Sequence, residues 1–270
     1  MNKEDARGVA EAYAPDARTF SIGGEGFEPT AQGRDAIAKD QSSMIEKFAL
    51  HFELERVLLR DGVGLVEWQA RGTYRANSIP VHLRGGQVLR FSDDGHIATE
   101  HSYSDTASVA IQVGLLSGRV REATPLRGTT DWVIPPAGAR DAELVARVRS
   151  MWTDPAALAA ALADDVVLDE VALPFEAKGK REALEVLGTY RTAMPDLAIR
   201  IEDAWAFGDV VVMTTVLSGT QTGPLQGLEA SGKRLALHLL DVVETRGDRV
   251  VRIRRYANRL EWLTEMGLVK

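Results

Sequence analysis

The sequence predicts an α+β chain built from two copies of one domain, each with helices covering one face of a mostly antiparallel sheet. Three observations lead to this prediction. The chain has 270 residues, more than one typical domain of about 100–150 residues. Short segments of the first half recur in the same order in the second half. Within the second half, helical periodicity comes first and strand-like alternation follows.

The internal repeat rests on pairs of similar segments with a nearly constant separation along the chain. The pairs are Ala31–Arg34 with Ala177–Lys180, Arg71–Thr73 with Ser218–Thr220, and Tyr103–Gly114 with Tyr256–Gly267. Such an ordered set is hard to obtain by chance, so we expect one domain at 1–116 and another at 141–270. Residues 117–140 are rich in Pro and Gly and predict a surface linker. Within it, Trp132–Ile134 is expected to pack on a domain or complete a sheet edge.

The second half carries the clearer pattern of elements. Apolar residues at helical spacing predict a helix from Asp141 to Trp152, and Asp154-Pro155 is an N-cap signature for a second helix through Ala163. A third helix is expected from Arg181 to about Ala193. Alternation then predicts strands at 197–201, 210–217, 234–245 and 249–256. In the first half few residues precede Tyr13, so its first helix is expected to be short or absent.

Composition excludes several classes of function. The net charge is −7 and no Lys/Arg-rich block occurs, which argues against a nucleic-acid partner. No apolar run approaches the roughly 20 residues of a membrane helix, and no secretory signal is visible, so we expect a cytoplasmic protein with no membrane partner. The absence of Cys excludes disulfides and thiol nucleophiles. No metal-binding spacing or phosphate-binding loop occurs, so neither a metal nor another cofactor is expected.

A set of short motifs follows in a distinctive order in the second half: Met194–Leu197, Gly208–Val211, Gly223–Leu228, Ser231–Lys233, Tyr256-x-Asn258 and Gly267-Leu268. This order resembles the SnoaL-like polyketide cyclases, members of the nuclear-transport-factor-2-like superfamily with ketosteroid isomerases and limonene-type epoxide hydrolases. The first half resembles them more weakly, through Gly33–Ile37, Arg90–Ile97 and Tyr103-x-Asp105. The resemblance implies two cone-shaped α+β barrels, packed as an intramolecular pseudo-dimer that could itself form homo-oligomers.

The resemblance also implies a catalytic residue in the first half. In SnoaL-like cyclases the acid/base is an Asp on the last strand, shortly before a Gln-x-Gly segment, and Asp105 matches this position. Alternation places His101, Tyr103 and Asp105 on one strand face. Asp105 would remove a proton, and His101 or Tyr103 would stabilise oxyanion charge. The alternative is that Asp105 caps the strand end and His101 is a solvated rim residue.

Other residues are candidates for binding a substrate. Trp68 shares an apolar strand face and is a plausible pocket wall. Gln87 of the first half matches Asp241 of the second, and Asp241 is expected either to point inward or to pair with an Arg. Tyr256 and Asn258 take the places of Tyr103 and Asp105. Because an Asn cannot accept a proton as an Asp does, the second half cannot use the same scheme.

The second half has an acidic pair of its own. Asp169 and Asp196 resemble the two carboxyl groups of polyether epoxide hydrolases, where one protonates the epoxide and the other activates the attacking hydroxyl. The alternative is structural: Asp196 follows a Pro and would satisfy backbone donors at a turn, and Asp169 would be solvated.

These observations predict a cofactor-independent cyclase or isomerase that acts by acid/base catalysis on a hydrophobic small molecule, as in polyketide-type natural-product biosynthesis. Two alternatives stay open. One is an epoxide hydrolase or epoxide-opening cyclase that uses the acidic pair of the second half. The other is a non-catalytic protein that only binds a small molecule or serves as a scaffold.

Overall fold

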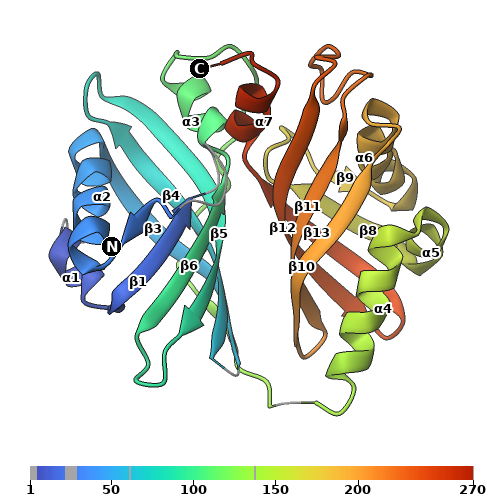
Figure 1. Cartoon of the computed structure of the whole chain (residues 1–270), viewed down its shortest axis with the longest axis horizontal. Coiled ribbons are helices and arrows are strands. Elements are labelled where there is room, and N and C mark those ends of the chain that lie inside the picture. The colour runs from blue at the N-terminus through green and yellow to red at the C-terminus, as the bar shows by residue number, and fades with distance from the viewer. Residues whose placement is uncertain (1–4, 22–28, 61, 137, 270) are drawn as a thin grey trace. The chain divides into compact units, whose positions relative to one another are not determined.

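The computed structural model describes residues 5–21, 29–60, 62–136 and 138–269, and the chain divides into two units at residues 134 and 135 (Figure 1). The first unit contains α1 (Ala6–Ala10), β1 (Tyr13–Ser21), β2 (Ala31–Gln32), α2 (Arg34–Lys47), β3 (Phe48–Arg60), β4 (Val63–Tyr74), β5 (Ile79–Phe91), β6 (Ile97–Ser104), α3 (Thr106–Gln112) and β7 (Asp131–Val133). The second contains α4 (Asp141–Thr153), α5 (Pro155–Ala161), β8 (Leu162–Glu170), β9 (Ala177–Lys178), α6 (Lys180–Ala193), β10 (Ala198–Phe207), β11 (Val210–Thr220), β12 (Arg234–Arg246), β13 (Arg249–Ala257) and α7 (Arg259–Glu265).

The two sheets have the same topology apart from β7, which is added to the edge of the first. The first has the order β2-β1-β6-β5-β4-β3-β7, and the second has the order β9-β8-β13-β12-β11-β10. In each sheet the first long strand pairs in parallel with the last, β1 with β6 and β8 with β13. The other neighbours are antiparallel, except β7, which runs parallel to β3. The predicted α+β fold and the internal repeat are therefore confirmed.

One repeated motif has a clear structural cause. Gly33 and Gly179 each follow a two-residue strand and precede a long helix, and their φ angles are +79° and +85°. This left-handed backbone is costly for residues with a Cβ atom, so glycine is favoured at both turns. Each glycine also donates its N–H to a carbonyl of the unit's first strand, Ala17 and Val166 respectively. The glycine thus holds the start of the helix against the sheet.

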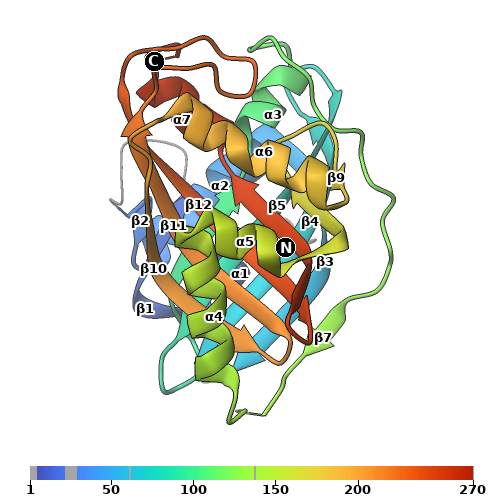
Figure 2. The ribbon, with the colours of Figure 1, turned by 90° about the vertical axis from the view of Figure 1, so that its right-hand side faces the viewer.

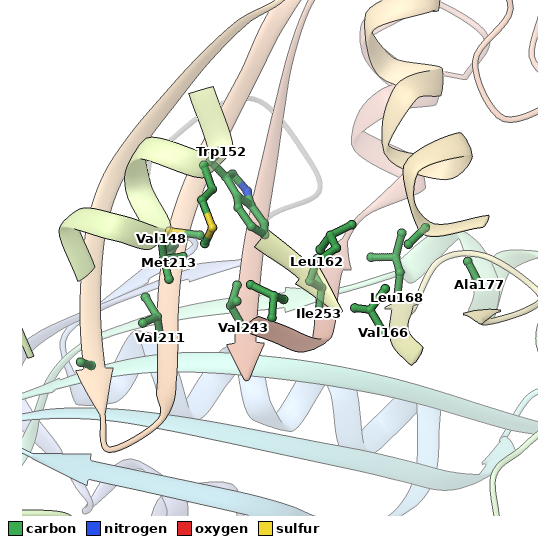
Figure 3. Packing of buried hydrophobic residues seen from close by; sticks show 14 residues of the cluster. Val148, Trp152, Leu162, Val166, Leu168, Ala177, Val211, Met213, Val243 and Ile253 are labelled. Atoms are coloured by element: carbon green, nitrogen blue, oxygen red, sulfur yellow. The ribbon is translucent and has the colours of Figure 1, made fainter. Parts of the chain in front are cut away.

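The core of the second unit lies between its helices and one face of its sheet. Figure 3 shows Val148 and Trp152 of α4 pointing toward Val211, Val243 and other residues of the strands. Figure 2 views this unit from the side of α4, α5 and α6, which lie in front of its strands. In the first unit, a smaller cluster around Ile37 joins α1, α2 and β1. The described helices include none long and apolar enough to cross a membrane.

Two local predictions differ from the structure, and two others agree with it. The second helix ends at Ala161 rather than Ala163, and a strand that the sequence analysis missed, β8, starts at Leu162. The parallel pairing with β13, not local propensity, makes residues 162–170 a strand. In the expected linker, β7 completes the edge of the first sheet through Trp132, as one of the two expectations for this segment stated. The first helix, α1, has only five residues, as expected.

Candidate active site

The first unit contains a cavity of about 460 Å³, within the size range of small-molecule sites. Residues from β1, α2, β3, β4, β5, β6 and α3 form its wall. The larger part of that wall is apolar or aromatic, and comprises Met44, Phe48, Leu50, Phe52, Trp68, Tyr74, Val81, Leu83, Val109, Ala110, Val113 and Leu115. Such a lining favours a hydrophobic ligand.

The wall also contains polar residues, among them Glu100 of β6. The Tyr13 hydroxyl donates a hydrogen bond to Oε2 of Glu100, and Gln87 Nε2 donates one to Oε1 at 2.8 Å. Glu100 is only 8% exposed. Burial raises the pKa of this carboxyl group, and the two hydrogen bonds lower it by less. Glu100 is therefore a buried, oriented carboxyl group whose ionisation is shifted toward neutral pH.

A second carboxyl group lines the same cavity. Asp40 lies on α2, one turn before Met44 and two turns before Lys47, and all three line the cavity. Burial raises the pKa of Asp40, and the charge of Lys47 lowers it by less. The charge of Asp40 in turn raises the pKa of Glu100. The charge of one carboxyl group thus affects the pKa of the other. In catalytic sites with two carboxyl groups, different surroundings give the two groups different pKa values, so that one can act as an acid and the other as a base.

The raised pKa of Glu100 predicts a pH dependence of stability. The folded state holds this proton to higher pH than the unfolded chain, so Glu100 should make the free energy of unfolding fall as pH rises above 4.5, the ordinary value for Glu. Glu100→Gln should remove this part of the slope. Urea unfolding of both proteins between about pH 4 and about pH 8 measures it. Equal slopes in the two proteins would contradict the prediction.

Trp68 lies where the sequence analysis placed it, in the cavity wall, and Gly85 makes room for it. Trp68 pairs with Gly85 across β4 and β5, and a Cβ atom on Gly85 would come within 2.3 Å of the indole Cζ2 atom. The indole ring therefore packs directly over the glycine backbone.

Gly85→Ala is expected to push the Trp68 ring into the cavity. We expect a loss of about 1–3 kcal/mol in stability from overpacking, and roughly tenfold weaker binding of a bicyclic probe such as 2-naphthol. Calorimetric titration and urea unfolding measure the two effects. Gly188→Ala is the control, because nothing lies within 4 Å of the added atom and the residue is helical. Equal binding by the Gly85 variant and the wild-type protein would contradict the prediction.

Asp105 does not line the cavity. It follows the end of β6, occupies the N-cap position of α3, and accepts a hydrogen bond from the Ser108 hydroxyl. Its counterpart in the second unit, Asn258, caps α7 by accepting from the Leu260 N–H at 3.0 Å. Asp and Asn are both favoured N-cap residues. The position therefore precedes a short helix in both units, and the Asp105 side chain, unlike that of Asn258, makes no capping hydrogen bond to a helix N–H.

His101 and Tyr103 also lie outside the cavity wall, so the expectation that their face of β6 lines the pocket was wrong. The His101 ring stacks on Phe20 with centroids 4.4 Å apart, and Tyr103 is 2% exposed. The cavity is lined instead by the alternate residues of β6: Glu100, Ser102 and Ser104. Both faces of this strand carry polar side chains, so alternation alone could not select the inner face. The pairing of Ser102 with Gln87 of β5 decides it.

Gln87 does line the cavity, whereas Glu100 and Asp40 were not identified from the sequence. Two signals could have found them. Glu100 shares its strand face with two serines, and Asp40 shares its helix face with Met44 and Lys47. Neither pattern indicates a function by itself, because the pairing of β5 with β6 determines which face of β6 lines the cavity.

Among the described residues, the second unit forms a much smaller cavity than the first, with a volume of about 100 Å³. Arg255 Nε donates to Asp241 Oδ1 at 2.7 Å, and Trp152 Nε1 donates to Asp241 Oδ2 at 3.0 Å. The expectation that Asp241 pairs with an Arg is thus confirmed. Burial alone would lower the pKa of Arg255, but the charges of Asp241 and Glu170 raise it.

The loop that contains Gln226 also contributes side-chain contacts to the interior of the second unit. The Tyr190 hydroxyl donates to Glu170 at 2.7 Å, and the Gln226 amide donates to both Glu170 and the Tyr190 hydroxyl. Gln226 has a φ of +50°, which is uncommon for a residue with a side chain. The loop thus inserts an amide into the polar network of the second unit.

The registers of the two sheets explain why one interior is open and the other filled. Gln87 pairs with Ser102 across β5 and β6, and Asp241 pairs with Arg255 across β12 and β13. These are equivalent positions in the repeat. The first unit carries neutral or short side chains there and leaves space, whereas the second carries an ion pair that fills it.

The acidic pair expected in the second unit is not assembled in its cavity. Asp169 is buried and accepts from Arg254 Nε at 3.0 Å. Asp196 is half exposed and accepts from the N–H and hydroxyl of Thr220, which lower its pKa. Neither lines the cavity of about 100 Å³. Tyr256 is fully buried and also lies outside that cavity wall.

No group of three or more His, Asp or Glu side chains in the described ranges could hold a metal ion. The polar residues that line the first cavity are groups that can transfer protons and form hydrogen bonds. Glu100 and Asp40 are the titratable carboxyl groups in its wall, and Thr19, Ser21, Ser102 and Ser104 carry hydroxyl groups there.

Two family models match the chain. One, described as SnoaL-like polyketide cyclase, matches residues 142–266, and another, described as SnoaL-like domain, matches residues 1–100. No curated protein matches the chain. Solved structures similar to one half of the chain include a SnoaL-like protein from Jannaschia sp. CCS1, with 16% identity and a TM-score of 0.46 over 50% of this chain and 99% of that one.

Two further structures show the same partial coverage. TsrD from Streptomyces laurentii has 21% identity and a TM-score of 0.41, over 47% of this chain and 95% of that one. An LEH-like epoxide hydrolase from M. tuberculosis has 16% identity and a TM-score of 0.39, over 48% of this chain and 92% of that one.

Proposed function

Both halves of the chain belong to the SnoaL-like family, and on that premise we propose that the first unit is an enzyme that works by acid/base catalysis without a cofactor. Its substrate is a hydrophobic small molecule, and its reaction is a ring closure or isomerisation of the kind met in polyketide-type natural-product biosynthesis. One observation carries the proposal: the buried Glu100 carboxyl group lies in the wall of an apolar cavity of about 460 Å³, with its pKa raised by burial.

The proposed chemistry is proton transfer at a carbon next to a carbonyl group. The Glu100 carboxylate takes the proton and becomes a carboxylic acid, and it returns a proton to the substrate when the new bond has formed. Tyr13 and Gln87 hold the carboxyl group in one orientation. The hydroxyl groups of Ser21 and Ser102, which pair across β1 and β6 and line the cavity, are available as donors to the enolate oxygen.

Asp40, on helix α2, supports the proposed role of Glu100 as the base. Its charge raises the pKa of Glu100, which makes the Glu100 carboxylate a stronger base. An ordinary Glu would be a weak base near neutral pH, and a base with a pKa nearer to the working pH is more effective.

The function is proposed for the first unit because its cavity of about 460 Å³ is much larger than the one formed by the described residues of the second. The ion pair of Asp241 with Arg255 occupies the equivalent wall, and the remaining cavity is about 100 Å³. Epoxide opening by Asp169 and Asp196 is not favoured, since neither residue lines the cavity of about 100 Å³ and their carboxyl groups bond to Arg254 and Thr220.

Deuterium uptake by a small ketone tests the proposal. 2-Tetralone is a flat bicyclic ketone with acidic protons next to its carbonyl group. In D₂O the protein should accelerate their exchange above the buffer rate, and 2-naphthol should inhibit this by occupying the cavity. Binding of 2-naphthol without any accelerated exchange would favour the non-catalytic alternative, a protein that only binds small molecules.

Asp105→Asn separates the two candidate bases. Because Asn caps the equivalent helix in the second unit, the variant should fold normally and keep its exchange rate within about twofold of the wild-type rate. Mass spectrometry of the recovered 2-tetralone measures the rate. A loss of about a hundredfold or more would return the catalytic role to Asp105.

A further inference from the structure

A second hollow in the first unit reaches Glu100 from outside the main cavity. It is more open, with a volume of about 700 Å³. Besides the residues that it shares with the main cavity, it is lined by Asp5, Gly8, Val9, Ala12, Tyr13, Leu89 and Ile97, and we call it the α1 hollow. Gln41, Gln87 and Glu100 line both spaces. The Glu100 carboxyl group therefore lies in the partition between them.

The two spaces differ in chemistry. The main cavity has a largely aromatic and aliphatic wall, which suits an organic ligand. The α1 hollow is bordered by the exposed residues Asp5, Gly8 and Ala12, so bulk water reaches it. Tyr13 lines only the α1 hollow, and its hydroxyl group donates to Glu100. Tyr13 thus joins the water side of the partition to the carboxyl group that faces the ligand side.

In the second unit, longer helices occupy the place that α1 takes in the first, before the first long strand. There, Trp152 of α4 with Pro155 and Leu158 of α5 line the small cavity. Those helices have thirteen and seven residues, whereas α1 has five. Among the described residues of the first unit, α1 alone occupies the corresponding place before the first long strand.

We propose that Glu100 exchanges protons with solvent through Tyr13 and the α1 hollow, while the organic substrate enters by the main cavity. The inference rests on the proposed role of Glu100. After Glu100 has taken a proton from the substrate, its carboxylic acid passes a proton to the Tyr13 oxygen as the Tyr13 hydroxyl releases its own proton to a water molecule in the hollow. The carboxylate and the neutral tyrosine are restored and one hydronium ion forms. The same relay in reverse delivers a proton from water to Glu100, which returns it to the substrate, so the full cycle releases no net proton.

Because the substrate and the protons use different openings, the substrate stays away from bulk water while Glu100 can still exchange its proton with solvent. A substrate that fills the main cavity blocks the way to solvent on that side. A base with only one opening could exchange its proton with water only after the ligand had left. A second, aqueous opening removes that constraint.

The exchange rate of the Tyr13 hydroxyl proton with water tests the proposal in the full-length protein. NMR saturation transfer from water measures this rate, with the signal assigned by its loss in Tyr13→Phe. Saturating 2-naphthol in the main cavity should leave the rate unchanged within about twofold. Ala12→Trp should lower it by tenfold or more, because a large side chain at this exposed position covers the α1 hollow. Ala12→Ser is the matched control and should behave as the wild-type protein.

The opposite pattern would overturn the proposal: exchange slowed by 2-naphthol and insensitive to Ala12→Trp. If Ala12→Trp does not fold, Val9→Trp fills the same hollow and must give the same slowing. The measurement needs no turnover, so its outcome is independent of the 2-tetralone assay. Failure of the ketone assay with normal Tyr13 results would remove the enzymatic function but keep the water route.

Discussion

Glu100→Gln is expected to lower the rate of 2-tetralone deuteration by about 10²–10⁴-fold, the range for loss of a general acid or base. The amide has the shape of the carboxyl group and keeps an oxygen that accepts from the Tyr13 hydroxyl. Gln87 can turn its own amide to present its oxygen to the new N–H group. The fold and the cavity should therefore persist while the proton-transferring group is lost.

Two measurements support the interpretation of that result. Calorimetric titration with 2-naphthol should give an affinity within about threefold of wild type, which shows that the cavity is intact. In the wild-type protein the exchange rate should rise with pH through an inflection above the ordinary value of 4.5 for Glu, because burial raises the pKa of Glu100. Glu100→Gln should lose this inflection. A variant that keeps the wild-type rate would exclude Glu100 as the base.

Asp241→Leu is expected to cause the largest loss of stability. The change leaves the Arg255 guanidinium buried without its main partner, and breaking a buried ion pair from one side costs about 3–5 kcal/mol. Trp152 would lose its acceptor as well. Hydrogen–deuterium exchange of β12 and β13 amides reports the second unit by itself, and urea unfolding of the full chain gives the free energy.

A matched substitution and a double variant serve as controls. Gln87 stands at the equivalent position of the first unit and lines a hollow cavity, so Gln87→Leu should cost far less than Asp241→Leu. Combining Asp241→Leu with Arg255→Met removes both charges and should recover most of the loss, since apolar replacements of buried ion pairs are often neutral. If Asp241→Leu alone costs less than about 1 kcal/mol, the ion pair does not hold the second interior together.

The Gln-x-Gly segment, which the resemblance connects with Asp105, has a structural role of its own. In the structure, Gln112 accepts from the His82 N–H at 2.9 Å and donates to the His82 carbonyl at 2.8 Å. It thus satisfies backbone groups of β5, and Gly114 ends the turn after α3 with a φ of +82°. The motif and Asp105 both serve the short helix that follows the last strand.

Much of the architecture follows from local patterns. The repeated segments, the helix starts at Gly33 and Gly179, and the strands that begin at Val210, Arg234 and Arg249 are all readable from the sequence, because turns and alternation depend on neighbouring residues. The strand at residues 162–170 was missed, because its parallel partner lies far along the chain.

The sequence by itself determined that the chain is a duplicated α+β fold of the SnoaL-like type, with Trp68 and Gln87 as candidates for a pocket wall. Only the tertiary structure decided which face of β6 is inside and which of the two interiors is hollow. The physical reason is the two-residue period of a strand: a shift of one position exchanges its faces, so Glu100 and His101 trade places according to cross-strand register alone. The volume left inside depends likewise on side chains that meet only after folding, Gln87 with Ser102 in one unit and Asp241 with Arg255 in the other.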